Sequence, residues 1–304
     1  MSTVGFIGLG AMGSHMAGRL LAAGHQVYGT DRTRSKAAAL VERGLVWSGT
    51  SREVAAAAEV TFSSVSDDAA VEAITAGPDG ILAGLAPGKV YVDMSTIAPE
   101  TSRQIAARVR AVGAEMLDAP VSGSVPAAED GTLVIMVGGD EETFRAVEPL
   151  LRTLGRTVTH IGTNGQALLL KLAINLNLGV QMLAFSEGVL LAERGGIDRK
   201  LAVEVMTESA IGSPMVRARA PFVLELPADA WFDVHLMAKD LGLALEAGHE
   251  LAVPLPTGAT TAALLAWAAE LGYERRDIAA LFEVLARTAT SDVTVSNVEA
   301  GDLP

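Results

Sequence analysis

The sequence contains no cysteine among its 304 residues. This absence excludes disulfides, thiolate-bound zinc and a thiol nucleophile. The five histidines are scattered and none forms an H-E-x-x-H pair, so we expect no catalytic metal site. Aromatic residues make up only 4% of the chain against 50% for all hydrophobic residues, so the core has to be built from Leu, Val, Ile and Ala.

Positive charge is also scarce, since 23 Lys and Arg stand against 36 Asp and Glu. Nucleic-acid binding needs a basic face, so we expect no nucleic-acid partner. The N-terminus lacks the basic start and unbroken apolar run of a secretion signal, which favours a cytoplasmic protein. The most membrane-like segment, roughly 167–192, contains Lys171, and a lysine in mid-bilayer costs ~2.5–3.5 kcal/mol. We therefore expect no membrane span.

Short β-rich runs alternate with helical patterns up to about residue 162. The first run is Thr3–Gly8, a helical pattern follows from Met12 to Ala23, and a second run ends at Asp31. Further strand candidates are EVTFSSVS, KVYVDMS, EMLDAPV and TLVIMVGG. Such alternation predicts a mostly parallel sheet covered on both faces. We predict an α/β domain over residues 1–162, a doubly wound Rossmann-type sheet.

Strand patterns stop after Gly162, and helical patterns take over. One long, apolar helix is predicted from Asn164 to Gly195, with a Pro-containing loop around 212–230. Shorter helices are predicted at about 198–209, 236–250, 257–271 and 275–288. This pattern indicates an all-helical domain over 163–292, followed by a polar tail over 293–304. We expect the helical domain to bind substrate and to join subunits in a homodimer or homotetramer.

The glycine-rich stretch GLGAMG, Gly8–Gly13, fits the pattern G-x-G-x-x-G. A strand precedes it and a helix follows, as the dinucleotide-binding fingerprint requires; an ordinary tight βα turn is the alternative. Glycine at the first position allows the tight turn, at the second the approach of a pyrophosphate, and at the third close helix–strand packing. The predicted phosphate-binding residues are Gly8, Gly10, Ala11, Met12 and Gly13.

The residues after the second strand give two indications about the cofactor. Asp31 can accept hydrogen bonds from the ribose hydroxyls of NAD and would repel the 2′-phosphate of NADP. Arg32 and Thr33 follow immediately, and an arginine there can bind that phosphate. We predict that Asp31 and Arg32 contact the cofactor, which is NAD or NADP, with a slight preference for NAD.

One lysine, Lys171, interrupts the apolar stretch LLLKLAINLNL of residues 168–178. A helix that is apolar nearly all round is normally buried, and a buried ammonium group is unfavourable unless it is paired. The lysine can extend to solvent from a helix end, or it can serve as a proton-transfer group in a pocket.

Four blocks in this order identify a family resemblance: GFIGLGAMGSHMAGRL, VDMSTIAP, DAPVSGSVPAAEDGTLVIMVGGD and GTNGQALLLKLAINLNLGVQMLAFSEG. A weaker fifth block is MAKDLGLAL. Over about residues 3–290 the chain resembles the β-hydroxyacid dehydrogenase family, which is related to 6-phosphogluconate dehydrogenase. The resemblance implies hydride transfer between a nicotinamide cofactor and a small carboxylic acid that bears a β-hydroxyl group or an aldehyde.

The resemblance also assigns roles to single residues. It makes Lys171 the general acid/base and Asn175 its substrate-orienting partner; positions i and i+4 share a helix face. It makes Ser122 and Gly123 the binders of the substrate carboxylate, a role that the hydroxyl and backbone N–H groups of a Ser-Gly turn suit. Ser124 stands where many relatives have glycine, which bears on the choice of substrate.

Several further residues are predicted to line the cofactor cleft. Thr96 contacts nicotinamide or substrate, or else caps the helix after Pro99. Val65 and Ser66 line the cleft after their strand. Lys239 lies near the nicotinamide in the family, and its neighbour Asp240 could pair with a neighbouring helix; an exposed surface ion pair is the alternative for both.

Two other functions share this fold. Imine reductases usually carry Asp or Tyr at the position of Lys171, which argues against the first. A non-catalytic NAD(P)-binding module usually lacks the lysine and carries extra domains, which argues against the second.

Overall fold

The strands of the N-terminal half form one sheet in the order β3-β2-β1-β4-β5-β6-β8-β7, and β9 pairs with β8. The pairs from β3 to β6 are parallel, β8 is antiparallel to β6 and β7, and β9 is parallel to β8. The computed structural model describes residues 1–288, so the predicted tail 293–304 lies outside the described residues. The strands are β1 (Thr3–Ile7), β2 (Gln26–Thr30), β3 (Val46–Trp47), β4 (Val60–Ser63), β5 (Val90–Asp93), β6 (Glu115–Asp118), β7 (Val121–Ser122), β8 (Leu133–Gly138) and β9 (Gly155–Gly162).

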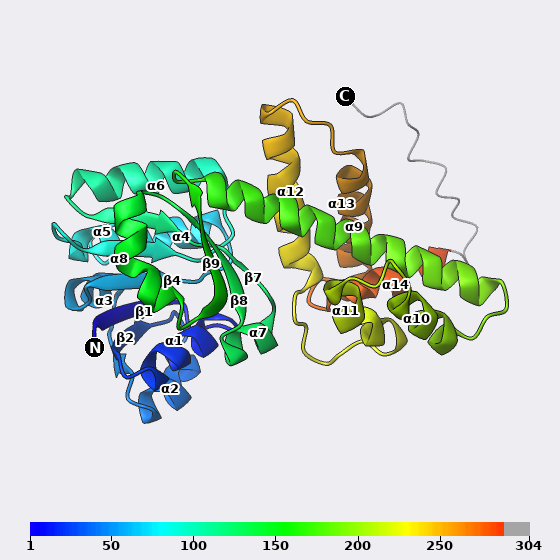
Figure 1. Ribbon diagram of the computed structural model, residues 1–304, viewed down its shortest axis with the longest axis horizontal. Coiled ribbons are helices and arrows are strands. Elements are labelled where there is room, and N and C mark those ends of the chain that lie inside the picture. The colour runs from blue at the N-terminus through cyan, green and yellow to red at the C-terminus, as the bar shows by residue number, and fades with distance from the viewer. Residues whose placement is uncertain (289–304) are drawn as a thin grey trace. The chain divides into compact units, whose positions relative to one another are not determined.

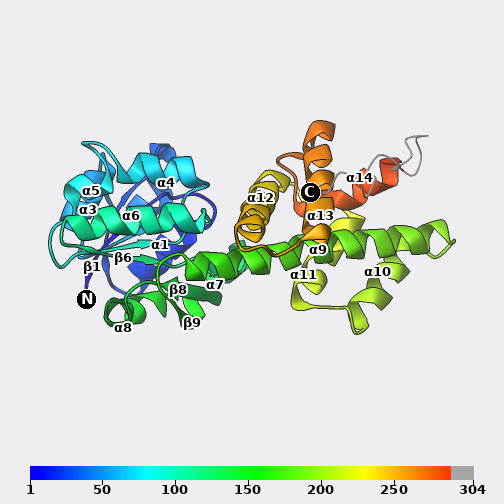
Figure 2. The same ribbon diagram turned by 90° about the horizontal axis from the view of Figure 1, so that it is seen from above.

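Helices cover both faces of this sheet (Figure 2). On β1, Val4 and Phe6 point into one apolar cluster and Ile7 into the other, because successive side chains of a strand alternate. The first face is packed by α1 (Gly13–Ala22), α2 (Ala38–Glu42), α7 (Val125–Asp130) and α8 (Glu141–Leu151). The second is packed by α3 (Ser51–Ala57), α4 (Asp68–Thr75), α5 (Ile81–Gly84) and α6 (Pro99–Ala111). The predicted doubly wound, mostly parallel sheet is confirmed.

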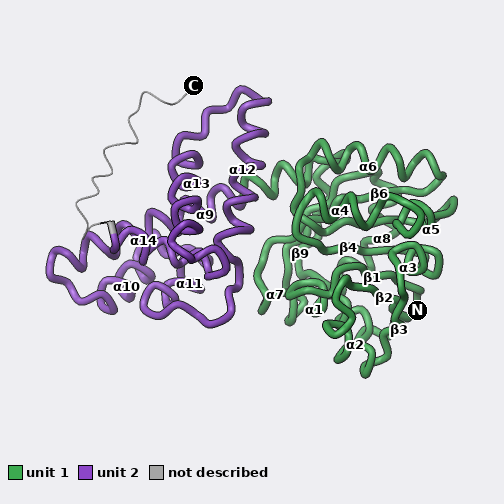
Figure 3. The backbone as a smooth tube through the Cα atoms, turned by 180° about the vertical axis from the view of Figure 1, so that it is seen from behind, with its two compact units in different colours: residues 1–174 green, residues 175–304 purple. Residues whose placement is uncertain are grey.

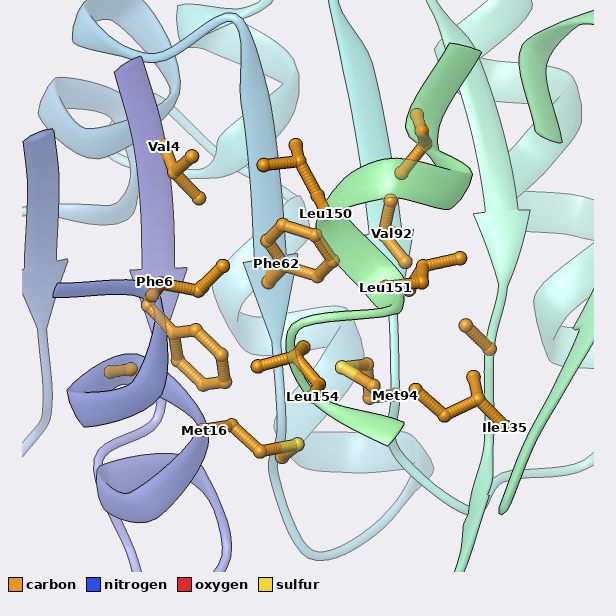
Figure 4. Packing of buried hydrophobic residues seen from close by; sticks show 14 of the residues in the cluster. Val4, Phe6, Met16, Phe62, Val92, Met94, Ile135, Leu150, Leu151 and Leu154 are labelled. Atoms are coloured by element: carbon orange, nitrogen blue, oxygen red, sulfur yellow. The ribbon is translucent and has the colours of Figure 1, made fainter. Parts of the chain in front are cut away.

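Figure 4 shows the core of the first face. Phe6 of β1 and Phe62 of β4 stack with ring centroids 6.1 Å apart. Met16 of α1 and Leu154, which follows α8, contact them from the helical layer. Few aromatic rings are needed, since aliphatic side chains fill the rest of this layer.

The C-terminal half is entirely helical over its described residues (Figure 1). The elements are α9 (Gln166–Arg194), α10 (Arg199–Glu208), α11 (Pro214–Leu224), α12 (Val234–Glu250), α13 (Pro256–Ala268), a π-helical turn (Ala269–Tyr273), a 3₁₀ turn (Ile278–Ala280) and α14 (Leu281–Thr288). Met182, Phe185 and Val189 of α9 lie three or four residues apart and pack into the core of this half. The predicted all-helical domain is confirmed.

The structure differs from the prediction at α11, at β9 and at the short strand β3, which no strand candidate covered. The loop expected around 212–230 contains α11, because Ser213 accepts a hydrogen bond from the Val216 N–H and Pro214 stands at the start of the helix. A proline there loses no hydrogen bond, so it starts a helix instead of breaking one. The strand β9 was not predicted, because it pairs only with β8 and six of its eight residues are polar or glycine.

The chain divides into two compact units, residues 1–174 and 175–304 (Figure 3). The division falls inside α9, so each unit includes a part of this helix. Among the described residues α9 is the one helix long and apolar enough to cross a membrane, and 39% of its 18-residue apolar window is buried inside the protein. Length and composition alone are weak evidence of a span, because the core helix of a soluble protein has the same properties.

Candidate active site

The glycine-rich turn joins β1 to α1. Gly8 has φ +87°, and a Cβ there would lie 2.3 Å from the Ser64 carbonyl oxygen. A Cβ on Gly13 would lie 2.0 Å from the Gly8 carbonyl oxygen, so these two positions admit only glycine. A Cβ on Gly10 would meet no protein atom within 4 Å. Side chains are thus excluded at Gly8 and Gly13, where the turn packs against the protein. At Gly10 the surface is free of protein atoms, so a phosphate group can approach the backbone.

The start of α1 suits an anion. Its N-cap is Met12, no side chain in the described part of the chain caps it, and its first turn contains no acidic residue. The first N–H groups of a helix need acceptors, and the helix dipole favours negative charge there. The amides around Ala11, Met12 and Gly13 therefore fit a pyrophosphate, as the dinucleotide fingerprint requires.

Asp31 fixes this turn to the end of β2. Its Oδ2 accepts a hydrogen bond from the Leu9 N–H at 2.8 Å, and its Oδ1 accepts one from the Thr33 N–H at 2.7 Å. A carboxylate oxygen has a second lone pair, so a ribose hydroxyl can still bind here. Arg32 is exposed, and the guanidinium of Arg34 lies 5.6 Å from the centre of the Trp47 ring. An acid and two arginines thus occupy this edge, which suits NAD or NADP.

A buried aspartate organises the ends of β4 and β5. Asp93 Oδ1 accepts hydrogen bonds from the hydroxyls of Ser63 and Ser95, both at 2.7 Å. Ser95 Oγ in turn accepts the Val65 N–H at 3.0 Å. Burial raises the pKa of Asp93 above its usual value. The backbone N–H of Val65 is therefore bound within the protein, and contact of Val65 with the cofactor stays a prediction.

The two other predicted contacts at these strand ends differ in exposure. Ser66 is exposed, and its hydroxyl donates to Asp67 Oδ2 at 2.7 Å. Thr96 is half-buried. The alternative role of Thr96 as the cap of α6 is wrong, because the N-cap is Ala98. Contact of Thr96 with cofactor or substrate stays a prediction.

The Ser122-Gly123 turn leads from the sheet into α7. Ser122 pairs with Val134 of β8, and Gly123 has φ +127°. A Cβ on Gly123 would lie 2.8 Å from Ala127 Cβ and 3.0 Å from Leu133 Cδ2. The turn therefore requires glycine, and its backbone is fixed by the sheet before it and the helix after it.

The long helix α9 places Lys171 and Asn175 one turn apart on the same face. Lys171 is half-buried, and Asn175 is 1% exposed. The Asn175 amide nitrogen donates to Asp240 Oδ2 of α12. Asp240 is buried, and its Oδ1 lies 2.8 Å from Lys239 Nζ. The exposed ion pair considered for Lys239 is wrong, since its side chain is only 18% exposed and that of its partner 3%.

The expected pairing of Asp240 with a neighbouring helix is confirmed by its hydrogen bond to Asn175 of α9, although Asp240 was not among the predicted site residues. Its carboxylate accepts from the Asn175 amide nitrogen, so Asp240 fixes the orientation of that amide. The sequence contains a signal for it: Val234, Met237 and Leu241 form the buried face of α12, and Asp240 stands on that face. An acidic residue on a buried helical face is rarely tolerated without a partner.

Replacing Asp240 by alanine is expected to lower kcat roughly tenfold, because the Asn175 amide loses the acceptor that fixes its orientation. The matched control is Asp233→Ala on the same helix, which removes the N-cap carboxylate that accepts from the Leu236 N–H. That loss destabilises α12 by about 1 kcal/mol and is expected to leave kcat unchanged. Steady-state kinetics of both variants test this role. An equal loss of kcat in both would show that Asp240 acts only through helix stability.

Among residues 1–288, no group of three or more His, Asp or Glu side chains is placed to hold a metal ion.

Comparisons with known proteins agree with this geometry. Residues 3–162 match the family described as the NAD binding domain of 6-phosphogluconate dehydrogenase, and residues 165–285 match the NAD-binding family of NADP-dependent 3-hydroxyisobutyrate dehydrogenase. The chain is 36% identical to 2-(hydroxymethyl)glutarate dehydrogenase of Eubacterium barkeri, over 92% of this chain and 94% of the relative. It is 37% identical to NAD-dependent L-serine dehydrogenase of Pseudomonas aeruginosa, over 91% and 95%.

Solved structures share the fold of this chain. Psf3 in complex with NADP+ and 2-OPP has a TM-score of 0.86 and 31% identity, covering 93% of this chain and 100% of that one. An imine reductase from Myxococcus stipitatus has a TM-score of 0.63 at 18% identity, and that likeness shows the fold alone. Relatives of this chain thus bind NAD or NADP.

Proposed function

Since the chain belongs to the 3-hydroxyisobutyrate dehydrogenase family of NAD(P)-dependent β-hydroxyacid dehydrogenases and semialdehyde reductases, we propose that it acts on a 3-hydroxypropanoate with a substituent at C2, or on the corresponding semialdehyde. One observation carries the proposed chemistry. Lys171 and Asn175 lie one turn apart on α9, and Asp240 orients the Asn175 amide.

The proposed substrate class rests on what three names among the relatives share. 2-(Hydroxymethyl)glutarate, L-serine and 3-hydroxyisobutyrate each have a carboxylate at C1 and a primary alcohol at C3. They differ only in the group on C2, which is carboxyethyl, amino or methyl. We infer that Ser122 and Gly123 bind the common carboxylate, and that Lys171 and Asn175 bind the common hydroxyl.

In the oxidation direction, Lys171 in its neutral form accepts the proton of the substrate hydroxyl while the carbon–hydrogen bond at C3 breaks. Asn175, whose amide Asp240 orients, lies one turn away and positions the substrate beside the lysine. In the reduction direction, Lys171 as an ammonium returns the proton to the carbonyl oxygen. When bound, NAD(P) supplies the hydride acceptor or donor.

The cofactor would be held by the start of α1 and by the edge of β2. Gly8, Gly10 and Gly13 shape the turn over the pyrophosphate, and Asp31 and Arg32 face the adenosine ribose. Val65, Ser66, Thr96 and Lys239 are the proposed contacts farther along the dinucleotide. Thr96 follows Ser95, whose hydroxyl Asp93 holds in place, so Thr96 is our choice for contact with both cofactor and substrate.

A substrate panel tests the proposed class. With NAD and with NADP, we expect turnover of L-serine, 3-hydroxyisobutyrate and 2-(hydroxymethyl)glutarate. The matched controls are methyl 3-hydroxyisobutyrate, which lacks the carboxylate, and lactate, whose hydroxyl is on C2; both should be turned over at least about a hundredfold less efficiently, a difference of ~2.7 kcal/mol. Reduction of cyclic imines without hydroxyacid turnover would make the protein an imine reductase. Tight cofactor binding without any turnover would make it a binding module.

We also propose that the helical half joins subunits. Several large apolar side chains are exposed there: Leu191, Leu201, Val205 and Ile211 are 52–77% exposed. Leu201 and Val205 lie one turn apart on α10 and share a face. Exposed apolar patches commonly mark interfaces. Sedimentation of Leu201→Glu, expected to dissociate a dimer or tetramer, tests this proposal, and a wild type that sediments as a monomer would contradict it.

A further inference from the structure

Asp118, the last residue of β6, is a buried carboxylate to which the proposed chemistry assigns no role. It is 0% exposed. Its Oδ1 accepts hydrogen bonds from the Gly165 N–H at 2.9 Å and from the Asn164 amide nitrogen at 3.1 Å, and the Ser102 hydroxyl lies 3.3 Å away. Residues 164 and 165 form the turn directly before α9. One carboxylate oxygen therefore binds the start of the helix that carries Lys171.

The turn before α9 is held by further contacts. The Asn164 amide nitrogen also donates to the Met116 carbonyl oxygen at 3.0 Å, and its oxygen accepts from Arg110 Nη1 at 3.2 Å. Thr163 N–H donates to Gln166 Oε1 at 2.8 Å, the second half of a capping box. Gly165 has φ +89°, and a Cβ there would lie 2.9 Å from the Pro99 carbonyl oxygen. The turn thus has one conformation, and Asp118 lies at its centre.

The same carboxylate also lies next to the substrate-binding turn in the sequence, since Asp118 precedes Ser122 by four residues. Between them the sheet fixes the backbone: Asp118 pairs with Gly138, and Ser122 pairs with Val134, both on β8. A Cβ on Gly138 would lie 2.7 Å from Asp118 Oδ2 and 2.8 Å from the Thr163 carbonyl oxygen. The glycine makes room for the carboxylate and the turn together.

Keeping a carboxylate here is unfavourable for the fold. The pKa of Asp118 is raised to about 6, chiefly by burial and to a lesser extent by the carboxylate of Asp93 on the neighbouring strand. The donors from Gly165, Asn164 and Ser102 act in the opposite direction and do not offset the burial. An apolar residue would avoid this penalty, so stability alone does not account for an aspartate at this position.

We propose that Asp118 is a positioning residue that fixes the first turn of α9, and with it Lys171, relative to the strand that leads to Ser122. The inference rests on the proposed role of Lys171 as the acid/base. Lys171 stands six residues after Gly165, about 9 Å along a rigid helix, so a tilt or shift of the first turn displaces its side chain. A displacement of ~1 Å is enough to lower a rate about a hundredfold.

Two substitutions test the inference. Asp118→Ala removes the acceptor, and we expect kcat to fall about a hundredfold while the dissociation constant of the cofactor stays within about threefold, because Asp31 and the glycine turn are untouched. Asp118→Asn removes the charge and keeps an oxygen for the three donors. We expect this variant to restore kcat to within about threefold of wild type. Hydrogen exchange of the amides of residues 166–171 should be faster in Asp118→Ala and native in Asp118→Asn.

Asp93→Ala is the matched control, because it removes an equally buried carboxylate one strand away that holds Ser63 and Ser95. It should leave exchange in α9 native. If Asp118→Ala does not fold, Asn164→Ala takes its place, with a roughly tenfold fall in kcat and faster exchange expected.

If the amides of α9 exchange as slowly in the folded variant as in wild type, the inference is overturned, whether or not Lys171 is the acid/base. Faster exchange with unchanged kcat would overturn it too. Failure of the proposed function has a different signature, which is full turnover by Lys171→Ala while the exchange results stand.

Discussion

Lys171→Ala is expected to lower kcat by about 10²–10⁴-fold on the true substrate, with cofactor affinity unchanged. The range is the usual contribution of one positioned general acid or base. Cofactor affinity should persist because the glycine turn, the start of α1 and Asp31 all lie outside the substitution. Stopped-flow measurement of NAD(P)H formation, together with titration of cofactor fluorescence, measures the two quantities separately.

Arginine at this position separates proton transfer from charge. Lys171→Arg keeps the positive charge, but its guanidinium does not lose a proton in a protein. If Lys171 transfers a proton, Lys171→Arg should be nearly as slow as Lys171→Ala. The control is Lys200→Ala, an exposed lysine of α10, which should behave as wild type. Near wild-type turnover by Lys171→Ala would mean that the lysine only extends to solvent from an apolar helix.

Gly10→Ala is expected to raise the dissociation constant of NAD and NADP at least about tenfold while the free energy of unfolding stays within ~0.5 kcal/mol of wild type. A Cβ at this position touches nothing in the protein, so the fold should tolerate it. The added methyl group occupies the space where the pyrophosphate of the cofactor approaches the turn. Isothermal titration and denaturant unfolding measure the two effects.

Gly13→Ala should give the opposite result. Its Cβ would lie 2.0 Å from the Gly8 carbonyl oxygen, so α1 has to move away from β1 and the fold is destabilised. The two variants add the same methyl group three residues apart, which makes them matched controls. Unchanged cofactor affinity in Gly10→Ala would contradict the dinucleotide site.

Much of the fold could be predicted because local patterns determine it. The apolar strands before glycine and aspartate turns, and the long apolar stretch of α9, have periods that follow directly from backbone geometry. The same patterns failed at Pro214, where a proline begins a helix, and at β9, which is polar along half its length. In both places the deciding contact is a cap or a neighbouring strand.

The candidate site likewise contains residues that the sequence predicts and residues that it does not. Gly8, Gly10 and Gly13 act through their own turn, so their spacing predicts them. The roles of Asp118 and Asp240 depend on hydrogen bonds to residues 47 and 65 positions away, to Gly165 and Asn175. A motif of neighbouring residues does not encode such pairs, even where, as at Asp240, a charge on a buried helical face marks the position.

The position of the division inside α9 limits how the nucleotide-binding half can be separated from the rest. A fragment ending at residue 162 would contain every strand of the sheet. It would still lack Leu168, which is buried in the core on the second face of the sheet. It would also lack the Asn164 amide nitrogen and the Gly165 N–H, which donate to Asp118. An excised or transplanted domain therefore has to extend to about residue 174, the first part of the next helix included. During synthesis, likewise, the core of the sheet is complete only after the first part of α9, up to about residue 174, has left the ribosome.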